Sequence, residues 1–497
     1  MRMLGGSLVV LLASVSLAAQ SPRIVPTTSA SPEALAAFNQ GRALTENNRE
    51  FEAAKHFQEA IALDPKFAMA YADRGDHLPG AQGLQDLLTA QRLAKGLEEA
   101  EQLFIDLYYA KRQEDVARQA KDIARLTFLA ADDWRVGFEE GDLAYSLRDF
   151  KKAAAGYRRA MTTAHTCVAY NNLGYALAMG EQFSDALVAF RRCADASPKE
   201  PNPHDSLGEV HLAQGRFDQA EAAFKRALEL SPDFVTAQMG LAFARVYRDD
   251  WGGGLTTLKN GLAPPFHLAD RMEMSAILAW VQLAHDQPVD ALATLDALEK
   301  EARAQKSEGQ YYLVVAPLQR AAIQNELGHY PEAIAAANTA LERLGTFSLP
   351  GSMDGALKRR TLVRRLWAEA KLGRTDEARK TLEQLKAEAT KLTDNAEVVS
   401  GLRLAQGAIL AASGDLPGAA REYSQCRLFG LSEYSFSFTV KPEDSFCLWQ
   451  LALVQDQLKD AAGAERTRAR LKRDFTRDPL ALYVRARLLK AGASAAT

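Results

Sequence analysis

The 497-residue sequence predicts an all-α protein, an α-solenoid built from antiparallel helix pairs. Two observations support this fold class. Alanine and leucine recur along the chain while runs rich in valine, isoleucine and threonine are nearly absent, which favours helix over strand. The chain is also too long for one compact core, and it contains an internal repeat, which is typical of a repeat array.

Composition and charge narrow the class of partner. The hydrophobic fraction is 47% and the charged fraction 25%, values that are typical of a folded chain. Lys and Arg number 60 against 63 Asp and Glu, so the formal net charge is −3. Because no segment carries the basic excess that a phosphate backbone requires, we expect no nucleic-acid partner.

The first 20 residues resemble a secretory signal. A short basic start, Met1 to Met3, precedes the uncharged apolar run Leu4 to Ala19, and Ser16 to Gln20 offers the small residues that a signal peptidase reads. We expect cleavage after residues 1–20, a linker over residues 21–32, and a periplasmic or secreted protein. An uncleaved membrane anchor is the alternative, but the run is shorter than the ~20 residues of a spanning helix. No later apolar run is long enough to span a membrane, so we expect no stable insertion after cleavage.

The repeat unit is clearest between Cys167 and Pro232. Two copies close with Pro198 and Pro232, which lie 34 residues apart. The matched positions are Tyr170, Leu173, Gly174, Leu177, Ala186 and Phe190 in the first copy, and His204, Leu207, Gly208, His211, Ala220 and Phe224 in the second. An N-terminal copy is marked by Gly41, Leu44, Ala53, Phe57, Ala60 and Pro65.

The spacing within a unit predicts two packed helices. Ala186, Phe190 and Cys193 lie at i, i+4 and i+7, which is one face of a helix. The small residues Gly174 and Ala186 allow the two helices to approach closely, and the ring of Phe190 fills the space beside them. The closing proline cannot continue a helix and so ends the unit.

The remaining segments are placed around these units. Residues 33–70 form an N-terminal repeat, 71–132 irregular helical repeats interrupted at His77 to Gly80, and 133–266 regular repeats. Residues 267–430 form degenerate repeats that keep a glycine at the turn and an alanine five residues later. Residues 431–444 form an insertion in which Tyr434 to Val440 alternates apolar and polar residues. Residues 445–490 form a C-terminal repeat with the capping helix Asp478 to Lys490, and 491–497 a disordered tail.

The order aromatic, Leu-Gly, large apolar, Ala, Phe, Pro at this period resembles the tetratricopeptide repeat. With the signal-like start, the chain is similar to an exported bacterial member of that family. The resemblance implies a right-handed superhelix in which the first helix of each pair lines an inner groove. It also implies a scaffold or adaptor that binds a protein or peptide partner, without catalysis and without a cofactor.

The groove positions follow from the four-residue spacing of the first helices. They are Asn171, Tyr175, Asn202, Asp205, Glu209, Met239, Phe243 and Tyr247. Amide, aromatic and apolar side chains of this kind suit an extended peptide. The alternative is that these residues pack between neighbouring repeats. The Lys and Arg clamp with which some family members hold a C-terminal carboxylate is not evident, because Asp205 and Glu209 would repel one.

Catalytic and metal sites are not predicted. The sequence lacks the short motifs of zinc hydrolases, serine hydrolases and nucleotide-binding loops. His204 and His211 lie two helical turns apart and need further ligands to share an ion, so we expect no metal site. Two other functions remain open. An enzyme would need His, Asp and Glu converging from non-adjacent repeats, and an assembly protein would add the Tyr434 to Val440 segment to a partner sheet as a strand.

The four cysteines suggest two disulfides. Cys167 begins a first helix and Cys193 lies near the end of the second, and these ends are neighbours in an antiparallel pair. Cys426 and Cys447 stand at neighbouring helix ends in the same way. With an export signal, the even count predicts the pairs 167–193 and 426–447. Cysteine is equally an ordinary small buried residue at such positions.

Overall fold

A computed structural model describes residues 22–46, 50–78, 80–162, 166–266, 268–305, 309–347, 351–390, 392, 396–426 and 443–474. These residues form 24 helices and no strand. The helices of the first half are α1 (Pro32–Thr45), α2 (Glu50–Leu63), α3 (Ala68–His77), α4 (Gly80–Leu93), α5 (Glu99–Arg112), α6 (Val116–Leu129), α7 (Trp134–Ser146), α8 (Phe150–Ala160), α9 (Cys167–Met179), α10 (Phe183–Ala196), α11 (Asn202–Ala213) and α12 (Phe217–Leu230).

The second half continues in the same way. Its helices are α13 (Val235–Tyr247), α14 (Trp251–Asn260), α15 (Leu268–Ala284), α16 (Pro288–Ala304), α17 (Gln310–Leu327), α18 (Tyr330–Thr346), α19 (Gly351–Lys371), α20 (Thr375–Glu388), α21 (Ala396–Ala412), α22 (Leu416–Ser424), α23 (Glu443–Gln457) and α24 (Ala461–Asp474). Each odd-numbered helix packs against the even-numbered helix that follows it. This confirms the prediction of an all-α solenoid of antiparallel pairs.

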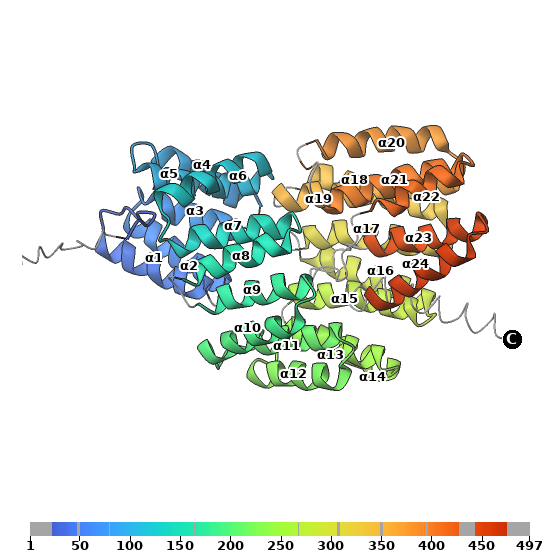
Figure 1. Cartoon of the computed structure of the whole chain (residues 1–497), viewed down its shortest axis with the longest axis horizontal. Helices are drawn as coiled ribbons and strands as arrows, with labels where there is room; N and C mark the ends of the chain where they lie inside the picture. Colours follow the sequence, from blue (N-terminus) through green and yellow to red (C-terminus); the bar gives the residue numbers. More distant parts are fainter. Residues whose placement is uncertain are drawn as a thin grey trace, which may run out of the picture.

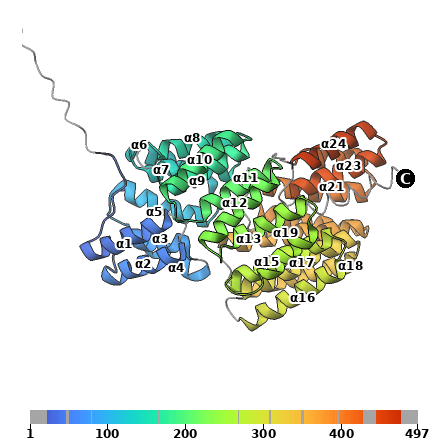
Figure 2. The ribbon, with the colours of Figure 1, turned by 90° about the horizontal axis from the view of Figure 1, so that it is seen from below.

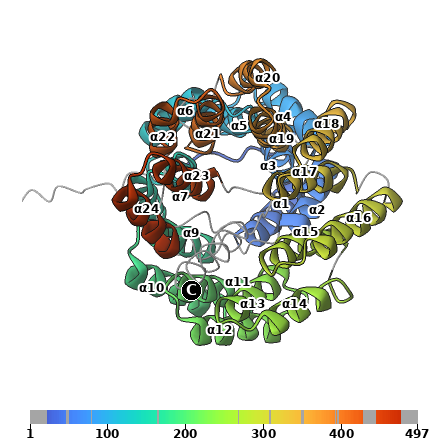
Figure 3. The same ribbon diagram turned by 90° about the vertical axis from the view of Figure 1, so that its right-hand side faces the viewer.

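The array winds around a centre so that its second half comes into contact with its first half. Figure 1 and Figure 2 show α1 to α10 on one side of the molecule and α15 to α24 on the other. Viewed from the right-hand side, the pairs surround a common centre, with α1, α3, α5 and α9 nearer to it than α2, α4, α6 and α10 (Figure 3). Helix α19 reaches α4 across this turn, and Arg359 Nη1 lies 3.4 Å from Glu114 Oε2.

Glycine at one position of the first helix explains the tight pairing. A Cβ atom added to Gly174 would lie 2.6 Å from the ring of Phe190, and one added to Gly141 would lie 2.6 Å from the ring of Tyr157. Any larger residue would therefore push the two helices apart. The sequence-based explanation of close approach beside a large ring is confirmed at Gly174.

Residues 71–132 are more regular than the sequence predicts. Helix α3 ends at His77 and α4 begins at Gly80, so the segment predicted to interrupt the array connects one helix to the next. Gly75 lies directly on Leu87 and the backbone around Gly83, where an added Cβ would be 2.9 Å from either. The glycines of this segment bring α3 and α4 together and leave the array continuous.

The N-terminal segment 22–31 lies extended against the array, although the sequence treats residues 21–32 as a linker. Three of its backbone N–H groups donate to carboxylates at 2.9 Å, in the pairs Arg23–Asp132, Val25–Asp133 and Thr28–Glu101. The Val25 side chain is buried in the core of the first helices. The segment therefore ties α5 and α7 together.

Several predicted segments lie outside the described residues. They are the signal segment 1–20, most of the insertion 431–444 including Tyr434 to Val440, the capping helix Asp478 to Lys490, and the tail 491–497. Within the described ranges, none of the helices combines the length and the hydropathy that a membrane span requires.

Candidate functional site

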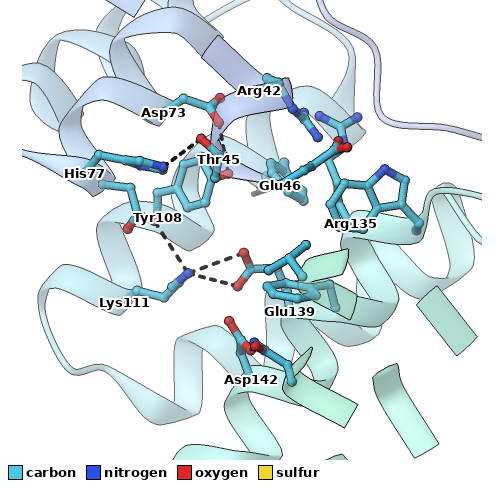
Figure 4. A pocket seen from close by; sticks show the side chains of 16 residues that line it. Arg42, Thr45, Glu46, Asp73, His77, Tyr108, Lys111, Arg135, Glu139 and Asp142 are labelled. Atoms are coloured by element: carbon cyan, nitrogen blue, oxygen red, sulfur yellow. Dashed lines mark hydrogen bonds and ion pairs between the residues drawn. The ribbon is translucent and has the colours of Figure 1, made fainter. Parts of the chain in front are cut away.

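A cavity of about 390 Å³ opens on the first helices of the first five pairs. Each of α1, α3, α5, α7 and α9 contributes side chains to it (Figure 4). The charged and polar lining residues are Arg42, Thr45, Glu46, Asp73, Asp76, His77, Tyr108, Lys111, Arg135, Glu139, Asp142 and Asn172. Phe104, Trp134, Phe138 and Val168 complete the wall. A concave site with aromatic walls and several convergent polar groups is typical of a binding site.

Helical periodicity brings these residues together. On α7, Phe138 and Asp142 lie one turn apart, and on α5 the residues Phe104, Tyr108 and Lys111 follow at i, i+4 and i+7. The lining residues of each helix thus share one face, and on α7 this face also touches α8, where the Tyr157 hydroxyl donates to Asp142 at 2.7 Å. The solenoid then places five such faces side by side.

Lys111 is the centre of a carboxylate cluster. Its Nζ lies 3.1 Å from Glu139 Oε2 and 3.7 Å from Asp76 Oδ2, and 5.3 Å from the centroid of the Tyr108 ring. Burial raises the pKa of Glu139 to about 7, against the opposing effect of Lys111, and the neighbouring carboxylates add to the rise. Burial also raises the pKa of Asp142. The carboxylates of this cluster therefore outnumber the cation that holds them.

Asp73 is a second feature of the cavity wall. Its side chain is 4% exposed, and its Oδ2 has no hydrogen-bond partner among the described residues. Its Oδ1 accepts from the Tyr108 hydroxyl at 3.4 Å, and burial raises its pKa. Nearby, Thr45 Oγ1 lies 3.0 Å from His77 Nε2. A buried acceptor without a donor is uncommon in folded proteins.

Two arginines stand at the other end of the cavity, near Trp134. Arg135 Nη2 donates to Asp133 Oδ2 at 2.5 Å and to the Val25 carbonyl at 2.9 Å, so the N-terminal segment borders the site. The Arg42 guanidinium lies 5.9 Å from the Trp134 ring centroid. Although burial opposes it, the hydrogen bond and charge of Arg135 lower the pKa of Asp133. Asp133 therefore neutralises Arg135 at this end of the cavity.

The groove residues predicted from sequence lie elsewhere and mostly inside the array. Asn171, Asp205, Glu209, Met239, Phe243 and Tyr247 are buried, while Tyr175 and Asn202 are half-buried. The polar members bond to one another: Tyr175 donates to Glu209 at 2.7 Å, and Asn202 donates to Asn171 at 3.1 Å. The structure thus shows packing between neighbouring helices, the alternative open from sequence, and leaves a partner little surface there.

The cavity residues were missed because the spacing rule was applied only to the later units. That rule chose Asn171 and Tyr175, three positions before and one after Gly174. Around Gly141 the same rule gives Phe138 and Asp142, which both line the cavity. Around Gly41 it gives Arg42, another lining residue. The signal was in the sequence, in units whose repeat pattern is weaker.

The remaining candidate residues are placed as follows. Cys167 is bonded to Cys193 with a Cα–Cα distance of 4.4 Å, and Cys426 to Cys447 with one of 6.4 Å. His204 and His211 are half-buried on α11, and burial lowers the pKa of each. Across the described residues, no three His, Cys, Asp or Glu side chains are grouped closely enough to hold a metal ion.

Comparison with known proteins identifies the repeat. A family model described as tetratricopeptide repeat matches residues 206–234, which span most of α11 and all of α12. Heat shock protein STI1 of Saccharomyces cerevisiae is 31% identical over 115 residues, 23% of this chain and 19% of that protein. Small glutamine-rich tetratricopeptide repeat-containing protein 2 of Mycosarcoma maydis is 24% identical over 195 residues, 39% of this chain and 53% of that protein.

Among solved structures, the APC/C hetero-tetramer Cut9–Hcn1 matches with a TM-score of 0.37 and 15% identity. That match covers 84% of this chain and 76% of the other. The chain spans about a fifth of STI1 and about half of the Mycosarcoma protein, so it resembles its relatives over part of their length.

Proposed function

We propose that this chain of tetratricopeptide-type helix pairs is a scaffold or adaptor that binds a segment of a partner protein in the cavity of its first five pairs. One observation carries the proposal: five successive first helices contribute side chains to a single cavity. A partner segment that lies along them would contact several repeats at once, which is how repeat arrays use an extended concave surface. The relatives with tetratricopeptide repeats support the same class of function.

Site-specific crosslinking tests this proposal. Phe138 is half-buried in the cavity wall, and Phe128 on α6 is 66% exposed outside it. Replacing each in turn by the photocrosslinking residue p-benzoylphenylalanine keeps an aromatic side chain at both sites. We expect illumination in cell extract to join a defined partner to the Phe138 variant and not to the Phe128 variant. Equal crosslinking at both positions, or none at Phe138, would remove the cavity as the binding site.

Export to the bacterial periplasm or the medium is part of the same proposal. The apolar run Leu4 to Ala19 has the composition of a signal segment, and both cysteine pairs are positioned to be bonded, as in an oxidising compartment. Fractionation of cells that express the full chain, followed by N-terminal sequencing, tests it. Protein in the cytoplasm that keeps Met1 would contradict export.

Enzymatic activity is the second candidate function, because His, Asp and Glu side chains from non-adjacent repeats converge in the cavity, as expected of an enzyme. His77, Asp76 and Glu139 converge from α3 and α7, which are non-adjacent helices. A buried carboxyl with a pKa of about 7, as Glu139 has, suits a general acid or base. Turnover of a glycoside or peptide substrate that Glu139→Gln abolishes while the fold persists would favour catalysis over binding.

A further inference from the structure

The charges that line the cavity do not balance. Asp133 neutralises Arg135 at the Trp134 end of the site. The other charged lining residues are the carboxylates of Glu46, Asp73, Asp76, Glu139 and Asp142 and the cations of Arg42 and Lys111. Among the described lining residues, five carboxylates therefore face two cations. When these carboxyls are ionised, their negative charges repel one another, and a cationic ligand would relieve that repulsion.

The chain's own lysine shows how the cavity holds a cation. Lys111 reaches between Glu139 and Asp76 and lies against the Tyr108 ring. Asp142 adds a third carboxylate beside the same ammonium group and raises the Lys111 pKa together with the other two, against the effect of burial. Three carboxylates around one ammonium leave acceptor oxygens for a second one. The ring faces of Phe138 and Trp134 in the same wall are suitable partners for it.

Asp73 points to the same ligand class independently. It is buried, lines the cavity, and has an acceptor oxygen without a donor (Figure 4). It lies on α3, outside the ion-pair contacts of Lys111. An ammonium or guanidinium group carries several donors and no acceptor, so it can satisfy an unpaired carboxylate oxygen.

We propose that the cavity receives a lysine or arginine side chain of the partner segment, between Asp73 on α3 and the Glu139–Asp142 pair on α7. This inference rests on the proposed binding function and names its ligand class. The carboxylates are spread over three helices, and no described group of them is compact enough for a metal ion, which favours an extended organic cation.

The pKa values of the cluster predict how binding depends on pH. The charged groups that act on Glu139 are Lys111 on α5, Asp76 on α3 and Asp142 on α7. Tyr108, His77 and Arg42 line the same cavity, and Tyr157 on α8 donates to Asp142. Because burial holds the Glu139 pKa near 7, a bound cation must displace protons from the site below that pH. Binding is therefore expected to weaken as the pH falls from about 8 to 5.

Matched peptides test the ligand class on the full mature chain. The probes are fluorescein-labelled ten-residue Gly/Ser peptides with three Lys, three norleucine or three Glu residues at identical positions. We expect fluorescence anisotropy to show at least tenfold tighter binding of the Lys peptide than of the norleucine peptide, and the weakest binding for the Glu peptide. Equal affinity for Lys and norleucine, or competition by CaCl₂ beyond that of NaCl at equal ionic strength, would overturn the proposal.

The matched variants separate the site from general electrostatics. E139Q with D142N removes two carboxylates from the cavity, and E332Q with D376N removes two exposed ones from α18 and α20. We expect the first double variant to weaken binding of the Lys peptide at least tenfold and the second to leave it within twofold. If the first double variant loses its circular dichroism signal, Asp73→Asn replaces it in this test, because that substitution breaks no ion pair. Equal effects of the two double variants would contradict a specific site.

Failure of this inference is distinguishable from failure of the proposed function. If a partner crosslinks at Phe138 but the Lys and norleucine peptides bind equally well, the scaffold function is supported and the proposed cationic ligand is wrong. If the Lys peptide binds through Glu139 and Asp142 but no partner crosslinks at Phe138, the cation-binding site is supported and the scaffold function is not.

Discussion

Helices α7 and α13 occupy the same place in their helix pairs, yet one borders a charged cavity and the other is enclosed in the core. When Gly141 is aligned with Ala242, Glu139 corresponds to Gly240 and Asp142 to Phe243. On α13, Met239 and Phe243 are 0% and 1% exposed and join the large core of the second half. Both helices pair with the helix that follows them, and the side chains on their inner faces differ.

This comparison explains why the predicted groove and the observed cavity differ. Large apolar residues on the inner face of α13 bury surface against the neighbouring pairs. Helices α3 and α7 instead carry the carboxylates of Asp73, Glu139 and Asp142 on their inner faces, and these line the cavity. Four measurements test this contrast, in decreasing order of the free-energy change that we expect.

Alanine substitution of the two equivalent faces gives the largest difference. Phe243→Ala should destabilise the chain by about 3–5 kcal/mol, because it leaves a cavity in a filled core. Phe138→Ala removes a half-buried ring and should cost only about 1 kcal/mol. Urea unfolding of both variants, with amide exchange of α7 and α13, measures the contrast. Equal losses would mean that the two inner faces are equally packed.

Loss of a disulfide should destabilise the helices that it joins and leave the first helices of the chain unaffected. The cysteine pairs close loops with sequence separations of 26 and 21 residues, and each is expected to contribute about 3 kcal/mol. Because the bonds cross-link α9 with α10 and α22 with α23, C167S/C193S should accelerate amide exchange in α9 and α10 and leave α1 to α6 unchanged. Four free thiols on alkylation of unreduced protein would show that the chain has no disulfides.

Buried carboxyls in the two regions should differ in their response to a ligand. Burial raises the pKa values of Glu139 and Asp205 to about 7 each. The folded chain then binds more protons than the unfolded chain between about pH 4 and 7, so stability falls as the pH rises through this range and levels off above it. E139Q and D205N should each flatten this slope, by about 2 kcal/mol between pH 5 and 8.

The Lys peptide sharpens this test. A cation bound in the cavity should suppress the slope that Glu139 contributes and leave that of Asp205, which lies outside the cavity, intact. Thermal melts across pH, with and without peptide, measure it. Suppression of both contributions would show that the peptide acts on net charge instead of on one site.

The contact between the two halves should give the smallest effect. Arg359→Gln removes the ion pair between α19 and Glu114, which lies in the turn between α5 and α6, and should cost less than about 1 kcal/mol because the pair is partly exposed. Small-angle scattering should still detect a looser turn of the array. A loss of several kcal/mol would mean that the halves fold as one unit across this contact.

The sequence determined the helix pairs and their class of packing. A glycine in the first helix, an alanine and a large ring in the second, and a closing proline recur at fixed spacing. Each has a local cause: Gly174 makes room for Phe190 within a single unit. The pair 167–193 was predicted for the same reason, since Cys167 and Cys193 belong to the two helices of one pair.

The location of the cavity was decided by the tertiary structure alone. Asp73, Lys111 and Glu139 lie on three different helix pairs, and their meeting depends on how far each pair is rotated against the next. That rotation arises from packing summed over many side chains, and no short segment encodes it. Local spacing therefore predicts which residues face inward on each helix, and only the assembled array decides which inner faces stay open.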